Sequence, residues 1–375
     1  MNSLPYIAVF LSFIALGLIE SRAPTRKIKR VAIITSIVVY SLFFGLRGFI
    51  LTDFANYYPA FNSIHDDSAN PDAYSYSTAF FWLVYCAKTL LGSYSAYIFA
   101  SAVIHAAIFS AIAWRIVGNI GLSLAFFMVF RGIVYEINLM QNYVSILFFL
   151  WSLSYVQSRR PSRFLVANAL GSAVHPPSVI YLLSYLPLRY HFNRLVYVSL
   201  CLAAGVYWVT GQNLLISFLR SLANVLGPSF VEFLNIYTDR EAIYLSVAGN
   251  LERIAILFLI LVFYKKIKTK FEMFEVVFVL YIIYALSYFL LWNIEAIASR
   301  VSLLFVCSTW FVVPMVILSF RGSEKALLII LFACLGVVKI YVATVDEVAE
   351  YRTVFSGESY LEAAEKVRVH NEGRP

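Results

Sequence analysis

The sequence predicts an all-α fold, a polytopic transmembrane helical bundle. Hydrophobic residues make up 61% of the 375 residues, and charged residues make up only 13%. Several apolar runs are about 18 residues or longer and carry few charges, which is typical of membrane-spanning helices. These runs are continuously apolar instead of alternating, which favours helices over the strands of a membrane barrel. We expect about 10–12 membrane segments, some of them re-entrant.

The apolar runs can be assigned in order along the chain by their length. The predicted simple crossings are residues 3–20, 31–51, 95–114, 119–135, 142–157, 195–210, 247–264, 272–291, 300–320 and 326–344. The segments 74–91 and 164–188 are also apolar, but they do not fit the scheme as simple crossings.

The basic loops suggest how these two segments are arranged. If every segment crossed once, Arg115 and the loop 159–163 would face outward, against the positive-inside tendency. The conflict disappears if 74–91 enters and leaves on the outer side, and if 164–188 enters from the cytoplasm and returns. Two prolines after His175 favour such a break, because proline removes a backbone donor. Both chain ends then face outward.

The predicted organisation is a single transmembrane catalytic domain, residues 1–344, followed by a polar tail, residues 345–375. Outer loops are expected at about 52–94 and 211–246, and the tail is expected to be an exposed short helix or disordered. The net charge of +8 is explained by the basic loops, so no nucleic-acid partner is expected.

The sequence lacks the common signatures of metal and nucleotide sites. It has no Gly-rich phosphate loop and no HExxH motif, and its four cysteines lie singly in apolar runs. We therefore expect no metal and no other cofactor, with any chemistry taking place inside the helical bundle.

One arginine lies unusually deep in an apolar run. Arg47 lies about a turn from the end of the run that begins at Val31, and Asp53 and Tyr57 follow it. A charge at this depth costs about 3 kcal/mol or more, so Arg47 needs an anion, a protein partner or water. It is interpreted either as an anion clamp or as an interfacial arginine paired with Asp53.

The predicted topology places other arginines in the same outer half of the membrane. Arg300 opens an apolar helix, where a positive charge opposes the helix dipole, so ligand contact is favoured and Glu295 is a possible partner. Arg253 has Glu252 beside it as an alternative partner. Arg131 and Arg240 complete the group. Arginine binds phosphate through a forked head that is always charged.

Polar residues that could transfer a proton or bind a sugar are also placed in this half. His175 lies at the predicted break, and it is interpreted either as a general base or as a structural histidine. Gln141 heads the helix 142–157, where it could cap the helix or bind sugar hydroxyls, and Tyr57 could stack on sugar rings. His105, in an Ala-rich run, is interpreted as a packing contact.

Arginines around an outward cavity, with one histidine, fit a lipid substrate that carries a diphosphate. The guanidinium groups would stabilise the leaving diphosphate, a role that a metal has in many soluble glycosyltransferases. The alternatives are a flippase or transporter of the same lipid-linked oligosaccharide, and a membrane O-acyltransferase that uses an intramembrane histidine.

In these residues the sequence resembles the EpsG branch of the Wzy-type polysaccharide polymerases. The similarity runs over roughly residues 31–320. It comprises Leu46-Arg47-Gly48 with Thr52-Asp53 and Tyr57, Gln141 at a helix start, His175-Pro176-Pro177, and Ala298 with Arg300. The resemblance implies a GT-C-like helical enzyme of the bacterial plasma membrane. Such an enzyme joins polyprenyl-diphosphate-linked oligosaccharide repeat units on the outer, periplasmic face, for O-antigen, capsule or exopolysaccharide.

The resemblance also assigns expected roles. Met140 stands where the family often has arginine, with Arg131 as a candidate substitute, and no acidic residue lies at 74–76. The expected catalytic residues are His175, Asp53, Arg47 and Arg300. The expected diphosphate- and sugar-binding residues are Arg253, Arg131, Gln141, Tyr57, Arg240 and Glu295. The expected partners are the lipid-linked donor and acceptor, the bilayer and a chain-length regulator protein.

Overall fold

The computed structural model describes residues 2–64, 76–190, 193–210, 217, 221, 247–291 and 295–372. Within these residues the chain is almost entirely helical, and strand-like pairing is limited to a single bridge between Arg47 and Thr353. Six of the described helices are long and apolar enough to cross a membrane. The prediction of a polytopic helical bundle is therefore confirmed.

The chain divides into two compact units, residues 1–185 with 317–375 and residues 186–316. The long helices of the first unit are α1 (Leu4–Arg22), α2 (Arg26–Gly45), α5 (Tyr94–Ile116), α8 (Met140–Gln157), α9 (Pro161–Val174) and α20 (Gly322–Thr344). Its shorter helices are α3 (Phe54–Ser63), α4 (Thr78–Leu91), α6 (Ile120–Phe127), η2 (Met128–Gly132), α7 (Ile133–Ile137), η3 (Pro176–Val179), α10 (Ile180–Leu183), η5 (Glu347–Ala349) and α21 (Tyr360–Glu372). The helix α11 (Tyr185–Arg189) follows α10.

The second unit is built around α17 (Phe274–Leu290), which packs against α12 (Arg194–Thr210), α15 (Val247–Val262) and α18 (Glu295–Phe305). It also contains α16 (Tyr264–Lys268), η4 (Val306–Ser308) and most of α19 (Thr309–Leu318). The predicted outer loop 211–246 lies outside the described residues except at positions 217 and 221.

Local sequence signals explain where the helices of the first unit begin. The side chains of Thr25, Ser77, Ser93 and Asn119 each accept a hydrogen bond from a backbone N–H in the first turn that follows. Such caps satisfy donors that the helix itself leaves unpaired. Most of the stability of these helices must nevertheless come from packing, because they are apolar nearly all round.

Basic residues in and beside the loops between the long helices of the first unit gather at one end of these helices. The Lys29 ammonium lies 4.4 Å from the centre of the Trp114 ring, and the Arg115 guanidinium lies 5.2 Å from that of Trp151. The Lys325 ammonium lies 3.1 Å from the Ser21 hydroxyl. These contacts bring together the C-terminal ends of α1, α5 and α8 with the N-terminal ends of α2 and α20. We call this the basic end.

The other ends of the same helices meet at the opposite side of the unit. The Tyr351 hydroxyl donates to the carbonyl of Phe43 near the end of α2, at 2.7 Å, and the Tyr6 hydroxyl of α1 donates to the carbonyl of Ala349, at 2.9 Å. We call this the far end. The predicted grouping of the basic loops on one side is thus confirmed within this unit.

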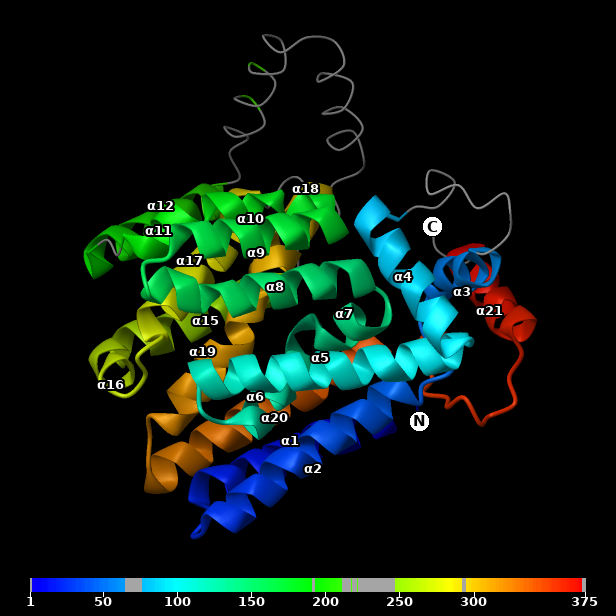
Figure 1. Ribbon diagram of the computed structural model, residues 1–375. Helices are drawn as coiled ribbons and strands as arrows, with labels where there is room; N and C mark the ends of the chain where they lie inside the picture. Colours follow the sequence, from blue (N-terminus) through cyan, green and yellow to red (C-terminus); the bar gives the residue numbers. More distant parts are fainter. Residues whose placement is uncertain are drawn as a thin grey trace. The chain divides into compact units, whose positions relative to one another are not determined.

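The described parts of the two ambiguous segments, 76–91 and 164–185, return to the end of the unit at which they start, whereas the membrane side from which they enter remains a prediction (Figure 1). α9 starts at the basic end and reaches His175 at the far end, and the chain then turns back. On the return, Tyr181 stacks on Phe149 at 3.9 Å and Tyr185 lies 5.1 Å from Phe164, close to the start of α9. The helix α4 has both of its ends at the far end: Ser77 contacts Val174, and Lys88 contacts the carbonyl of Asn62. It does not cross the unit.

The polar tail contains the predicted short helix, α21, but the residues before it are not simply exposed. Residues 348–354 lie along the loop that follows α2. The N–H of Gly48 donates to Arg352 at 2.8 Å, and that of Leu51 donates to Val348 at 2.7 Å. We call residues 346–359 the strap. Its assignment to a domain separate from residues 1–344 remains a prediction.

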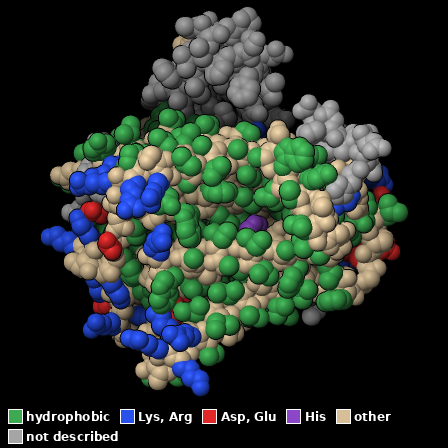
Figure 2. Space-filling view, in the orientation of Figure 1, with side chains coloured by type: hydrophobic (Ala, Val, Ile, Leu, Met, Phe, Trp, Pro, Cys, Tyr) green, Lys and Arg blue, Asp and Glu red, His purple; other side chains and the backbone are tan. Residues whose placement is uncertain are grey.

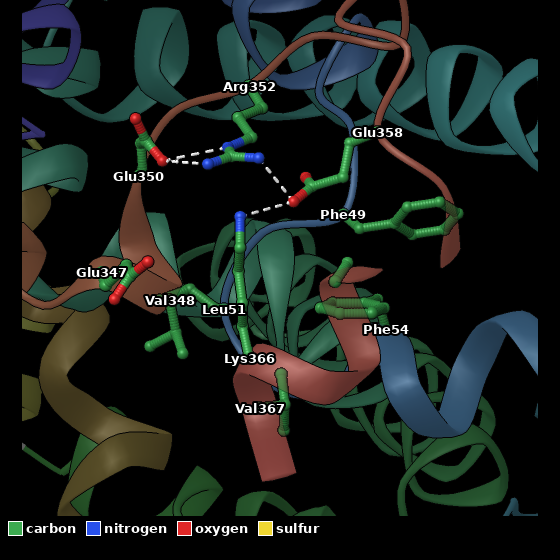
Figure 3. A pocket seen from close by; sticks show the side chains of 11 residues that line it. Phe49, Leu51, Phe54, Glu347, Val348, Glu350, Arg352, Glu358, Lys366 and Val367 are labelled. Carbon is green, nitrogen blue, oxygen red and sulfur yellow. Dashed lines mark hydrogen bonds and ion pairs between the residues drawn. The ribbon is translucent and has the colours of Figure 1, made fainter. Parts of the chain in front are cut away.

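The strap is held by charge pairs and by a small apolar cluster. Figure 3 shows Arg352 between Glu350 and Glu358, with Lys366 of α21 reaching the same Glu358 carboxylate at 2.7 Å. Below them Ala363 and Val367 of α21 pack on Phe54 of α3. The strap and α21 therefore support the segment from residue 46 to α3.

Candidate functional site

A polar pocket of about 490 Å³ opens at the far end of the first unit. Its walls come from four separate parts of the sequence: the start of α3, the start of α4, the start of α8 and the break after α9. The lining residues are Asp53, Asn56, Tyr57, Tyr76, Ser77, Leu139, Gln141, Asn142, His175, Pro176 and Pro177. Four of the residues predicted from the sequence, His175, Asp53, Gln141 and Tyr57, are thus brought to one cavity.

His175 is placed in the pocket by the end of α9. The residue before a proline is pushed into extended backbone, and His175 has φ −139° and ψ 96°. Its own N–H still donates to Gly171 at 2.9 Å, and its carbonyl accepts from Ser178 at 2.9 Å. The backbone is therefore fixed on both sides of the break, while the half-buried imidazole lines the cavity.

Asp53 is held at the start of α3 by the connection between α7 and α8. The Asn138 amide accepts from the Asp53 N–H at 3.4 Å and donates to the Thr52 hydroxyl at 3.1 Å. The Thr52 hydroxyl donates to the Asp53 carboxylate at 3.3 Å. Burial raises the pKa of Asp53 above its usual range, and the Thr52 hydrogen bond opposes that shift. A carboxylate with a raised pKa is a stronger base.

The polar wall opposite is formed where α4, α8 and α9 meet. The Ser77 hydroxyl donates to the carbonyl of Val174 at 2.5 Å, and the Ser77 N–H donates to the Gln141 side-chain oxygen at 3.4 Å. The Gln141 side chain is thus held against the start of α4, and both roles considered for it remain predictions. Tyr57 and Tyr76 stack with ring centres 5.5 Å apart, which presents an aromatic face beside these groups.

Arg47 lies outside the pocket lining. Its side chain is 6% exposed, and it donates to the carbonyls of Phe44 and Glu136 at 2.8 Å each. It forms no hydrogen bond with Asp53 within the described residues. The guanidinium thus fixes the end of α2 to the end of α7, and its action as a diphosphate clamp remains a prediction.

The carboxylate of Glu136 is also buried and fully engaged. It accepts from the Tyr40 hydroxyl at 2.7 Å and lies 3.0 Å from Nδ1 of His105. His105 was predicted to be a packing contact, and its ring does pack edge-on against Tyr143, at 4.9 Å. The polar contact between His105 and Glu136 was not predicted from the sequence. We refer to Arg47, Glu136, His105 and Tyr40 as the buried network.

Arg131 occupies a strained position in the last third of the predicted crossing 119–135. It has φ 69° at a kink in η2 where the backbone of Phe130 and Arg131 is not helical, a conformation that is unfavourable for residues other than glycine. Its side chain is exposed, and within the described residues no side chain pairs with its guanidinium. Backbone strain of this kind clusters at functional sites. Its role in anion binding remains a prediction.

The remaining candidates belong to the second unit or lie outside the described residues. The Arg253 guanidinium lies 3.3 Å from the ring centre of Tyr288 and 5.1 Å from that of Tyr284. Arg300 is exposed on α18. The side chain of Glu295 is not described, and Arg240 lies outside the described residues. The structure leaves the binding roles of these four residues as predictions.

Some pocket residues were not chosen from the sequence. Asn56 and Ser77 carry no charge, so burying them in an apolar chain costs less than burying a charged side chain, and they do not stand out in the sequence. The available signal was spacing for Asn56, which lies one turn after Asp53 in the same helix start. Ser77 could have been found as the cap of α4.

The fold and the pocket together define a multi-pass α-helical membrane protein with a polar site at one end of its bundle. A family model described as the EpsG family matches residues 30–354, and the chain belongs to that family. No curated protein and no solved structure gave a match. The matched range contains every residue that lines the polar pocket, and membership indicates a membrane protein of the polysaccharide-polymerase type.

Proposed function

We propose that this protein is a glycosyltransferase that polymerises polyprenyl-diphosphate-linked oligosaccharide repeat units at the outer face of the bacterial plasma membrane. The observation that carries the proposal is the meeting of His175, Asp53, Gln141 and Tyr57 in one polar pocket. These residues come from three distant parts of the chain, the start of α3, the start of α8 and the break after α9. A histidine, a carboxylate, amides and stacked tyrosines suit a sugar ligand and a proton transfer.

The proposed sidedness follows from the two ends of the first unit. The basic ends of membrane helices usually face the cytoplasm. The pocket lies at the far end, so the proposal puts it on the outer side, where a lipid-linked repeat unit would be presented.

The proposed reaction is a displacement at the anomeric carbon of the growing chain. A sugar hydroxyl of the incoming unit forms the new C–O bond, and the bond from the anomeric carbon to the diphosphate breaks. The lipid diphosphate leaves with the bonding electrons. The proton of the attacking hydroxyl passes to His175 or Asp53, and the simplest stereochemical outcome is inversion. A positioned base of this kind contributes about 10²–10⁴ to a rate.

The negative charge on the leaving diphosphate must be stabilised. The proposal assigns this task to the arginines, with Arg131, Arg253 and Arg300 joined by Arg47, and requires no metal. Support for Arg131 comes from its exposed side chain and strained backbone. The two carbonyl partners of Arg47 give it a second, structural task.

The test is elongation of lipid-linked repeat units by the purified protein in liposomes, with and without EDTA. Elongation in both conditions, and its loss in the Arg131→Ala and Arg300→Ala variants, is the expected result. Arg163→Ala, at an exposed position near the start of α9, is the matched control and should elongate normally. Failure of the unmodified protein to lengthen repeat units, or full activity in both arginine variants, would count against the proposal.

The same experiment separates the alternatives. A flippase would move labelled lipid-linked units across the liposome bilayer without lengthening them. An O-acyltransferase would transfer acyl groups from an added acyl donor to the sugar. Either result without elongation would replace the proposed activity.

A further inference from the structure

A second, apolar cavity lies beside the polar pocket in the first unit. It has a volume of about 750 Å³ and lies between α4, α5 and α8. Its lining is almost wholly aliphatic and aromatic, and Leu83, Leu90, Ile104 and Trp151 on its walls are exposed. Figure 2 shows hydrophobic side chains spread over this face of the molecule. We call this cavity the apolar groove.

The apolar groove continues from the polar pocket along the same helices. On α8, Gln141 lines the pocket and its neighbour Met140 lines the groove. At the start of α4, Ser77 lines the pocket and Phe80, one turn later, lines the groove. Tyr57 belongs to the same packed cluster as Phe80 and Met140 and faces the pocket. Side chains of this packed cluster therefore separate the polar pocket from the apolar groove.

The length of the groove matches one membrane leaflet. Along α8 it extends from Met140 to Trp151, which is about 16 Å at 1.5 Å per residue. This is about half of a 30 Å hydrocarbon core. The end at Trp151 points toward the basic end, six residues before α8 ends, and Arg115 lies over the Trp151 ring. The groove thus extends from the far end into the bundle, with the polar pocket at its head.

We propose that the apolar groove binds the polyprenyl chain of the lipid-diphosphate substrate, with the sugar-diphosphate head in the polar pocket. This inference rests on the proposed function and adds the location of the lipid portion. A long hydrocarbon chain joined to a polar head is the ligand shape that a polar cavity beside an apolar one accommodates.

The groove acts mainly by positioning. A polyprenyl chain in a bilayer is already in hydrocarbon, so moving it onto the protein brings little hydrophobic gain. Packing between α4, α5 and α8 instead fixes where the head enters the pocket. A displacement of about 1 Å at a reacting centre can lower a rate by about 10².

Photolabelling of the unmodified protein tests the inference directly. Purified protein in nanodiscs is irradiated with a polyprenyl diphosphate that carries a photoreactive group on its chain and no sugar. Labelling is expected in residues 78–91, 94–116 and 140–157, with competition by unlabelled polyprenyl diphosphate. Labelling elsewhere would overturn the inference. So would equal competition by a phospholipid such as phosphatidylglycerol, which would mean that the groove holds bilayer lipid only.

A pair of matched variants tests the effect on the reaction. Ala100→Trp fills the groove from α5, and it should lower elongation about tenfold or more through misplacement of the head. Ala333→Trp, at a half-exposed position of the apolar helix α20, should leave elongation unchanged. Equal elongation by the two variants would contradict the inference. If Ala100→Trp fails to fold, the photolabelling result still decides.

The outcomes distinguish this inference from the proposed function. Groove labelling without any elongation of repeat units would leave the lipid site standing and remove the polymerase. Elongation without groove labelling would leave the polymerase standing and remove the lipid site.

Discussion

The first unit holds two sets of polar side chains with opposite surroundings. In the buried network every main group has a protein partner: Arg47 donates to two carbonyls, and Glu136 is shared by Tyr40 and His105. In the polar pocket His175, Asp53 and Gln141 face a cavity. Both sets are expensive to bury in an apolar bundle. The cost is met by protein groups in the first set, whereas the second leaves hydrogen-bonding capacity for a ligand.

This difference shows how to interpret a charge in a membrane sequence. Depth made Arg47 a candidate for anion binding, but depth does not distinguish a side chain with internal partners from one that faces a cavity. For each substitution, the experiments below compare the loss of elongation with the loss of free energy of unfolding, and this comparison separates the two sets.

The largest effect is expected in the polar pocket. His175→Ala should lower elongation by about 10² or more, because it removes a candidate base from the site. Stability should change by less than about 0.5 kcal/mol, since the imidazole faces the cavity. Elongation assays and thermal unfolding in detergent measure the two quantities. Normal elongation would remove His175 from the reaction, and a large loss of stability would mean that it belongs with the structural groups.

The buried network should show the reverse pattern. Glu136→Leu removes the carboxylate beside His105 and leaves the Tyr40 hydroxyl with only the Tyr143 hydroxyl, at 3.3 Å, so it should lower the free energy of unfolding by about 3 kcal/mol. Thermal unfolding measures the change. Glu362→Gln, an exposed carboxylate on α21, is the control and should unfold like the unmodified protein. A fully stable Glu136→Leu variant would contradict the structural role.

Arg47 can be assigned to one set or the other by a conservative change. Arg47→Lys keeps the charge but loses the fork that reaches both carbonyls, so we expect a loss of about 1–3 kcal/mol of stability. Activity should fall in proportion to the fraction that unfolds. A stable variant with strongly reduced elongation would instead support the diphosphate clamp.

The raised pKa of Asp53 predicts a dependence on pH. The folded protein keeps this proton at a pH where the unfolded chain has lost it, so stability falls as pH rises from the usual pKa through the raised one. Asp53→Asn should flatten this part of the stability profile. If Asp53 is the base, elongation should rise over the same pH window and the variant should lose that rise. Identical profiles for variant and unmodified protein would contradict both statements.

The smallest effect is expected in the strap. Arg352→Ala removes a partly exposed guanidinium between Glu350 and Glu358, so it should cost about 1 kcal/mol or less. Thermal unfolding of this variant beside Arg368→Ala, whose ion pairs on α21 are exposed, measures the difference. A loss of several kcal/mol, or lost elongation, would show that the strap is more important than its exposure indicates.

The helical bundle and the paths of 74–91 and 164–188 could be predicted from the sequence. Helix length, basic loops and a Pro-Pro break are local signals with strong physical causes. The pocket could be predicted in part, since His175, Asp53, Gln141 and Tyr57 proved to share a cavity. The partners of Arg47 could not be predicted, because a backbone carbonyl from α7 leaves no trace in residue type. Uncharged lining residues such as Asn56 and Ser77 were missed for the reason that charge-based reasoning ignores them.

The strap has a consequence for the biogenesis of the protein. The hydroxyl of Tyr351 reaches a carbonyl 308 positions earlier in the sequence, beside the loop that leads to Asp53. Chains emerge from the ribosome at about 5–20 residues per second, so α2 waits tens of seconds in the membrane for this contact. During that interval the nascent protein has its first helices inserted but the loop before Asp53 unsupported, which delays a finished site until the bundle around it has been made.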